Sequence, residues 1–424
     1  MALRLVVFYV LIACPYIWGQ DLELVRNGAL DLREWDQEKH PVISLDGDWE
    51  FYWNSLLLSR DLPNQNNKSY AQLSRPWNEQ LIGGQQLAQD GYATYSLKIF
   101  LPENLNSVSF AVPAVFNCYA FWINDRLICS SGKVGKSAQE MIPQWRPQTV
   151  SITSPADTLQ VIFQISNFQH TRGGCAEVMR IGNTEYLTGM SSAFHTSGIA
   201  LIIFFGITAA GGLIVFFIFR PNSFLFLSLL AMAFTLRFIF SDLYFYYDFG
   251  LLPSWEVAAK IEYLTISLIV ISSALFISSI YPKEFRRTRL YFFIVTNALL
   301  AVVIIFSSSS IFSPLLTVLQ VLALTFTMFV IYVLVKALIF QRAGAWVSVL
   351  GVTVFALVGF YNVYAFINVA DLNRIVIHSG YALALLLNVV SLVYRTPMRI
   401  HSEEHDTLHF SDFYKDQGVK EINR

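Results

Sequence analysis

The pattern of apolar residues divides the chain into two parts. Residues 193–395 are almost continuously apolar, whereas residues 20–185 are more polar, rich in turn residues, and alternate apolar with polar positions. A helix that crosses the hydrocarbon layer needs roughly 20 apolar residues, and polar breaks divide the second part into about seven such lengths. The pattern predicts an α+β membrane protein, with a β-rich domain followed by a seven-helix transmembrane domain.

Each apolar length is expected to form a helix, because backbone polar groups have no partners in lipid. The breaks between these lengths are short and polar, such as Arg220-Pro221-Asn222 and the serine run at 307–310. The predicted spans are 193–219, 223–240, 257–281, 290–306, 315–340, 345–367 and 375–394.

Basic residues are concentrated in alternate loops between the spans, and positive charge stays on the cytoplasmic side. The sequence therefore predicts a multi-pass protein of the cell (inner) membrane, with the amino-terminal domain outside the cytoplasm and a short cytoplasmic tail over 396–424. An odd number of spans agrees with this orientation. The basic loop residues are Arg220, Lys283, Arg286, Arg287, Arg289, Lys336, Arg342, Arg395 and Arg399, whereas the other loops carry Asp242, Asp248, Glu256 and Asp371 with only Lys260 and Arg374 nearby.

Period-two alternation predicts strands in the amino-terminal domain. Asn124-Asp125 between two of them is a hairpin turn signal, and residues 132–148 form a long loop of the kind that carries function. Many short strands without a helical pattern indicate an antiparallel sandwich or jelly roll. The predicted strands are 92–100, 108–112, 119–123, 127–130, 149–153 and 159–165.

Residues 1–19 are predicted to be a signal peptide, because Arg4 precedes a short apolar run at 5–12. The segment ending in Cys14 also resembles a lipoprotein cleavage box, but seven spans make a lipid anchor redundant, so ordinary cleavage is favoured. Cys118, Cys129 and Cys175 lie in the exported part, where disulfides are permitted. Two alternatives are open: a disulfide between Cys118 and Cys129, or three buried free thiols.

Overall charge is balanced, with 29 Lys and Arg against 30 Asp and Glu, which argues against a nucleic-acid partner. No cysteine spacing resembles a metal site, and no nucleophile, zinc-protease or phosphate-loop motif is present. Asp46, Asp48 and Glu50 lie close together, as paired glycosidase carboxylates do, but alternating solvated acids at a strand start explain them better. We therefore expect no enzyme activity, cofactor or metal.

Several strings in the exported domain, taken in order, resemble bacterial seven-transmembrane receptors with diverse intracellular signalling modules. The seven spans follow them, so the resemblance covers nearly the whole mature chain. The strings are Gly47-Asp48-Trp49-Glu50-Phe51-Tyr52-Trp53, Gly91-Tyr92-Ala93-Thr94-Tyr95, Phe121-Trp122-Ile123-Asn124-Asp125, Ser130-Ser131-Gly132-Lys133-Val134-Gly135, Pro143-Gln144-Trp145-Arg146-Pro147 and Gln164-Ile165-Ser166-Asn167-Phe168.

The resemblance implies a jelly-roll sensor, similar to the non-catalytic sugar-binding domain of some glycosidases, joined to a seven-helix transducer. It usually also implies a cytoplasmic kinase, cyclase or phosphatase domain. Only about thirty residues follow Tyr394 here, and so short a segment cannot bury a core. We expect either that a separate cytoplasmic signalling protein receives the signal or that the chain is a fragment of a longer one.

The candidate ligand site combines an aromatic face with hydrogen-bond donors, as a small ligand such as a carbohydrate requires. The alternative is that Trp145 packs over the sheet edge and Arg146 pairs with an acid. Trp49, Tyr52 and Trp53 are interpreted as core residues. The candidate residues are Trp145, Arg146, Asn167, His170 and Arg172.

Ionisable residues inside the spans are candidates for function. Arg237, Glu262 and His378 are predicted at similar depth in the outer third of the spans, with Asn362 joining them. We expect Arg237 to pair with Glu262 and tie two helices together. The alternatives are that Arg237 extends outward to Asp242 or that the pair is only structural.

These features favour a membrane receptor that senses an extracellular or periplasmic small ligand. Its expected partners are that ligand, membrane lipid and a cytoplasmic signalling protein. A transporter or channel subunit is the alternative, but it needs mid-membrane charges and broken helices, and the spans show few of either. A membrane scaffold whose tail recruits an enzyme is the third hypothesis.

Overall fold

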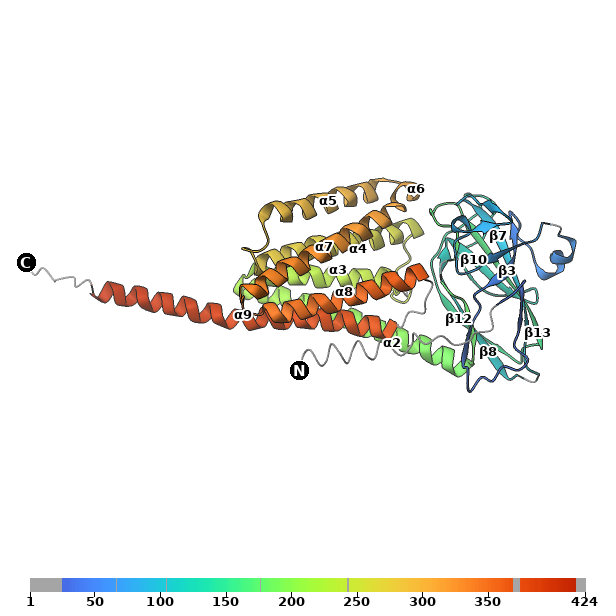
Figure 1. Ribbon diagram of the computed structural model, residues 1–424, viewed down its shortest axis with the longest axis horizontal. Helices are drawn as coiled ribbons and strands as arrows, with labels where there is room; N and C mark the ends of the chain where they lie inside the picture. Colours follow the sequence, from blue (N-terminus) through green and yellow to red (C-terminus); the bar gives the residue numbers. More distant parts are fainter. Residues whose placement is uncertain are drawn as a thin grey trace, which may run out of the picture.

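The computed structural model describes residues 25–416 except for 66, 104, 176, 242–243 and 369–373. A β-rich domain sits against one end of a bundle of long helices, and one helix projects beyond the other end (Figure 1). We call the bundle end that contacts the β-domain the proximal end, and the opposite end the distal end. The predicted signal peptide, residues 1–19, lies outside the described residues.

The larger sheet of the β-domain is antiparallel, except that its first strand pairs in parallel with β7. Two ten-residue strands, β7 (Gly91–Phe100) and β13 (Thr158–Asn167), pair along their whole length at its centre. The strand order is β11 (Arg126–Ser131), β10 (Cys118–Ile123), β13, β7, β3 (Asp48–Trp53) and β4 (Ser69–Gln72), with β1 (Ala29–Asp31) beside β7.

The smaller sheet has the strand order β12 (Gln148–Thr153), β8 (Ser107–Val112), β15 (Arg180–Gly182) and β2 (Val42–Ser44). Its Phe110 meets Phe121 of the larger sheet with ring centroids 5.4 Å apart, so the two sheets face each other across one core. This two-layer arrangement confirms the predicted sandwich, whereas the finer jelly-roll assignment stays a prediction. Short pairs β14 (Gly174–Cys175) with β9 (Val115–Phe116) and β5 (Leu81–Ile82) with β6 (Gln85–Gln86) complete the described strands.

The six predicted strands match β7, β8, β10, β11, β12 and β13 to within two residues. Asn124 and Asp125 both have positive φ, as a two-residue type I′ hairpin turn requires. Trp49 and Tyr52 are buried, and Trp53 packs on Trp77 with centroids 5.3 Å apart, which confirms their assignment to the core.

Two acidic side chains of the sandwich, Glu50 and Asp46, bond to neighbouring side chains, and its three cysteines are unbridged. Glu50 of β3 pairs at 3.0 Å with Lys68, the residue before β4, and the Asp46 carboxylate accepts a hydrogen bond from Ser74. Cys118, Cys129 and Cys175 are free thiols in the structure. Cys129 lies opposite Phe121 in the β10–β11 hairpin, which leaves Cys118 beyond the reach of a bridge across it.

Seven described helices are long and apolar enough to cross a membrane, which confirms the predicted spans. The first begins earlier than hydropathy predicts, at Thr184, because Asn183 caps it by accepting a hydrogen bond from the Tyr186 amide. The helices are α2 (Thr184–Phe219), α3 (Asn222–Phe240), α4 (Trp255–Ile280), α5 (Arg287–Phe306), α6 (Ser309–Phe312), α7 (Leu315–Ile339), α8 (Ala345–Asn368) and α9 (Arg374–Asp416).

The two domains are joined without a linker, since β15 ends at Gly182 and α2 begins at Thr184. At the distal end α9 continues as a helix to Asp416, through most of the segment expected as a tail, and residues 417–424 lie outside the described residues. Aromatic side chains fill much of the bundle interior, including Phe205, Phe234 and Phe238, whose centroids lie 5.2–6.1 Å apart.

Candidate functional site

The long loop 132–148 brings Trp145 onto the proximal end of the bundle. Its ring makes edge contacts with Trp255, the first residue of α4, at 5.2 Å, and with His170 at 6.1 Å. Tyr244, in the connection between α3 and α4, lies 6.0 Å away. Only 6% of Trp145 is exposed, so its ring is a contact between domains and offers no open face to a sugar.

His170 makes the second contact between the domains. Its ring stacks on Phe116 at 4.5 Å, and Nε2 lies 3.4 Å from the hydroxyl oxygen of Tyr263 in α4. The Arg172 amide donates to Nδ1 at 3.1 Å, so the proton of the neutral ring is placed on Nε2, facing Tyr263. Burial lowers the pKa of His170 to about 4, and the nearby Arg172 guanidinium acts in the same direction.

We call these contacts the domain interface and define it by Trp145, His170, Tyr244, Trp255 and Tyr263. A hydrophobic cluster surrounds it and includes the proximal parts of α4, α5 and α7 together with α6. Arg146 joins at the edge, where its guanidinium lies 5.5 Å from the ring centroid of Tyr247. The β-domain therefore rests directly on several helix ends, through side chains that the sequence marked as ligand contacts.

Asn167 shapes the loop that carries His170. It is fully buried, its side-chain nitrogen donates to the His170 carbonyl at 2.7 Å, and its side-chain oxygen accepts from the His170 amide at 3.0 Å. The same nitrogen also donates to the Gln89 carbonyl at 2.9 Å. Because these bonds occupy both ends of the amide, Asn167 positions the loop.

Arg172 connects this loop to a second part of the sandwich. Its guanidinium binds Glu79 in a bidentate pair, with Nε to Oε1 at 2.6 Å and Nη2 to Oε2 at 2.8 Å. The neighbouring Asn78 side chain accepts from the Gly173 amide at 2.9 Å. A Cβ at Gly173 would lie 2.3 Å from the Trp77 indole, so the close approach of loop and wall requires glycine there.

Glu79 also lines a hollow of about 440 Å³ beside β3 and β4, which we call the β3–β4 hollow. This hollow leaves no signal in the sequence, because most of its residues fall in a stretch with no clear hydrophobic period. It combines an exposed tyrosine ring with carboxylates, amides and a guanidinium, which are the groups that recognise polyols. Its lining residues are Asp48, Tyr70, Ala71, Gln72, Arg75, Glu79, Gln80 and Leu81.

The four polar residues predicted inside the spans take part in contacts between helices. Arg237 Nη1 lies 3.4 Å from both the main-chain oxygen of Glu262 and the hydroxyl of Thr265, so α3 is tied to α4 as expected, although this contact reaches the carbonyl. Pairing with the Glu262 carboxylate stays a prediction. Asp242, the alternative partner, lies outside the described residues.

His378 and Asn362 contact other helices. His378 Nδ1 lies 2.9 Å from the Ser197 hydroxyl, which joins α9 to α2. The Asn362 side chain donates to the Val358 carbonyl at 3.1 Å and lies 3.4 Å from the Tyr381 hydroxyl of α9. Of the four residues, these contacts bring Arg237 and Glu262 together and place Asn362 and His378 on the α8, α9 and α2 side.

Comparison with known proteins bears directly on this helical bundle. A family model described as 7TM diverse intracellular signalling matches residues 197–395, from the first span to the end of the seventh. The helical domain matches this family. The match indicates a signalling role at the membrane, and the seven long apolar helices agree with a multi-pass membrane protein. No curated protein matches the chain.

Among solved structures the chain is similar to several glycosidases. A GH2 β-galacturonidase from Eisenbergiella tayi bound to galacturonate is 12% identical, with 34% of this chain and 24% of that chain covered and a TM-score of 0.25. A β-glucuronidase from an uncultured Clostridium sp. is 11% identical, with 34% of this chain and 29% of that chain covered and a TM-score of 0.26. The Faecalibacterium prausnitzii β-glucuronidase is 15% identical, with 34% of this chain and 31% of that chain covered and a TM-score of 0.25. The chain thus spans about a quarter to a third of these structures.

Proposed function

We propose that this chain is a receptor whose β-sandwich lies outside the cytoplasm, senses a small ligand there, and signals through the seven helices to a separate cytoplasmic protein. The match of the helical domain to a signalling family supports the role. The basic connection between α4 and α5 lies at the distal end, away from the sandwich (Figure 1). Since positive loops stay inside, this placement supports an external sandwich.

The observation that carries this proposal is the burial of Trp145 between the sandwich and α4. A domain on a flexible tether cannot impose its conformation on a bundle. Here a loop of the sandwich packs on the first turn of α4, and β15 continues almost directly into α2. A change in the sandwich therefore acts on at least two helices at their proximal ends.

We assign ligand contact to the β3–β4 hollow and contact between domains to Trp145, Arg146 and His170. Tyr70 is 39% exposed and can stack on an apolar face of a sugar. Arg75 and Glu79 line the same hollow and offer a guanidinium and a carboxylate to hydroxyl groups. The ligand class proposed is a small carbohydrate, bound without catalysis.

Glu79 connects the hollow to the domain interface through Arg172. A ligand hydroxyl that bonds to Glu79 competes with the bidentate ion pair between Glu79 and Arg172. The Arg172 amide donates to the His170 ring, and that ring faces Tyr263 of α4. A ligand shifts the helices only if it prefers one arrangement of these groups. The Glu79–Arg172 pair is the element whose two states the ligand would distinguish.

The first experiment measures carbohydrate binding to the full chain in nanodiscs. A panel of neutral and acidic monosaccharides is titrated by isothermal calorimetry against the wild type, Tyr70→Ala and Tyr186→Ala. Tyr186 is a matched control, because it is exposed on α2 outside the hollow. We expect one sugar class to bind the wild type and Tyr186→Ala and to lose at least tenfold in affinity for Tyr70→Ala. No binding to any sugar would remove carbohydrate from the proposal.

The second experiment tests transmission from the hollow. Hydrogen exchange of residues 255–263 is compared with and without the bound sugar in the wild type, Glu79→Gln, His170→Phe and the double variant. We expect the sugar to change exchange at the start of α4 in the wild type, and the effects of the two substitutions to be non-additive. Additive effects would show that Glu79 and His170 act independently.

A further inference from the structure

A second cavity lies at the distal end, between the α4–α5 connection and the end of α7. Its volume is about 270 Å³. Five of its side chains are cationic, one is a carboxylate and two are aromatic. The lining residues are Lys283, Glu284, Arg286, Arg289, Tyr332, Lys336, Phe340 and Arg342.

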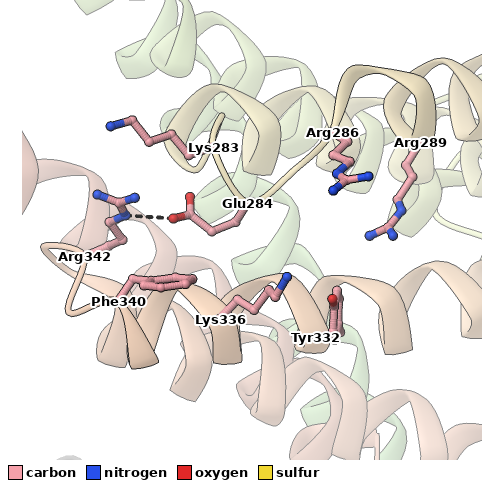
Figure 2. Close-up of a pocket in the computed structure, with 8 residues that line it drawn as sticks. All are labelled: Lys283, Glu284, Arg286, Arg289, Tyr332, Lys336, Phe340 and Arg342. Atoms are coloured by element: carbon pink, nitrogen blue, oxygen red, sulfur yellow. Dashed lines mark hydrogen bonds and ion pairs between the residues drawn. The ribbon is translucent and has the colours of Figure 1, made fainter.

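The cationic groups converge on the space between two elements. Arg286 and Arg289, at the beginning of α5, point toward the face of α7 that carries Tyr332 and Lys336 (Figure 2). Tyr332 lies between two cations, with Arg289 5.9 Å and Lys336 5.2 Å from its ring centroid. Arg289 also lies 5.3 Å from the Phe329 ring. Aromatic faces thus hold two of the cations in place.

The carboxylate leaves most of this positive charge unbalanced. Glu284 is buried at 8% exposure and pairs with Arg342, whose Nε lies 2.7 Å from Oε1 (Figure 2). Within the part of the chain that the structure describes, Lys283, Arg286, Arg289 and Lys336 have no carboxylate within ion-pair distance. Like charges held this close raise the free energy of the arrangement, and an anion in the cavity would offset that cost.

We propose that this cavity binds a phosphate group. Guanidinium forks match phosphate oxygens in bidentate geometry, and lysine adds a mobile point charge. The cavity is smaller than the ~300–1,000 Å³ of sites for drug-sized ligands, so it suits a single anionic group. It lies at the distal ends of α5 and α7, two helices long and apolar enough to cross a membrane, so lipid phosphates are expected at its depth. The phosphate belongs either to an anionic lipid headgroup or to a free phosphate compound.

Occupation would tie two helices together at the distal end. Arg286 and Arg289 belong to the beginning of α5, whereas Lys336 lies in the last turn of α7. A phosphate held by both sides would replace their repulsion with shared contacts and fix the α4–α5 connection against α7. This site depends on the membrane arrangement of the helices and stands apart from any ligand of the sandwich.

The experiment measures binding of a fluorescent short-chain phosphatidylglycerol to the full chain in detergent. One arm competes the probe with unlabelled phosphatidylcholine of the same chain length, and a second arm competes it with inorganic phosphate. The Arg286→Gln/Arg289→Gln double variant removes two cavity cations. Arg287→Gln is the matched control, because Arg287 is exposed on the same helix turn but does not line the cavity.

We expect the double variant to bind the probe at least tenfold more weakly than the wild type, and Arg287→Gln to stay within twofold. Displacement by phosphate at millimolar concentration identifies a free phosphate as a ligand, and its absence assigns the site to the lipid headgroup. Lys336→Gln, a single change on the other wall, gives the same loss if the double variant does not fold. Equal losses for Arg287→Gln and the cavity variants, or displacement by phosphatidylcholine, would overturn the proposal.

Discussion

Replacing Trp145 with alanine should weaken the hold of the sandwich on the helix bundle. The wild-type ring is 94% out of solvent, since 6% is exposed. A tryptophan buries up to ~250 Å², and at ~25 cal/mol per Å² this gives an upper value of ~6 kcal/mol. Measured Trp-to-Ala changes in packed interiors cost about 3–5 kcal/mol. We take that range for the loss of free energy at the domain interface, because Trp145 contacts His170, Tyr244 and Trp255 together.

Hydrogen exchange of the full chain in nanodiscs reports this loss locally. Amides of residues 255–263 in α4 should exchange faster by roughly 10²-fold to 4 × 10³-fold in Trp145→Ala, because each 1.4 kcal/mol changes an opening equilibrium about tenfold. Trp145→Phe should give a smaller increase, since it keeps an aromatic ring against Trp255. Exchange in the central strand β13 should change far less, because its partners lie within the sandwich.

The matched control is Trp346→Ala, which removes the same side chain from an exposed position of α8. It should leave exchange at residues 255–263 within twofold of the wild type. If Trp145→Ala also leaves those amides unchanged, the contact contributes nothing to docking. The sandwich would then not act on α4 through Trp145.

Three further predictions concern single groups. Because burial holds the pKa of His170 at about 4, below its usual 6.5, its contribution is complete above pH 6.5 and declines as the pH falls toward 4. The wild type should lose about 2 kcal/mol between pH 7.5 and 5, and the fall in its thermal midpoint should be smaller in His170→Phe. Glu284→Gln breaks the buried pair with Arg342 and should lower the free energy of unfolding by about 1–3 kcal/mol. The thermal midpoint should fall accordingly. Glu256→Gln, a control at a more exposed carboxylate in α4, should leave the midpoint unchanged. Burial raises the pKa of the Cys118 and Cys129 thiols to about 12, so maleimide at pH 7.5 should label neither before denaturation, as peptide mass spectrometry would show.

Hydropathy and alternation predicted the elements because both patterns follow from burial. The seven spans and six strands were predicted to within a few residues at most ends. The start of α2 was missed because residues 184–192 are mostly polar. That turn is helical because Asn183 caps it and Leu187 is buried against the sandwich, and neither effect changes hydropathy.

The candidate site was harder to predict because sequence does not say which loops face which neighbour. Residue type and loop position mark Trp145 and His170 as unusual, but a ligand role for them depends on exposure, which docking onto α4 removes. Arg237 reaches α4, where its guanidinium contacts the Glu262 carbonyl and the Thr265 hydroxyl. The rotamer that selects these partners cannot be read from the sequence. Tyr70 and Glu79 come together only when β4 closes on β3.

The length of α9 sets how far a movement at the sandwich would extend. At ~1.5 Å per residue its 43 residues span about 65 Å, roughly twice the hydrocarbon thickness of a bilayer. Arg374 at its first turn lies 4.0 Å from Glu177 of the sandwich. A continuous helix transmits rotation along its axis, so a twist imposed beside Glu177 would extend to the other end of α9 at Asp416. Pro397 has no amide hydrogen to donate, so it is the position at which α9 would bend most easily.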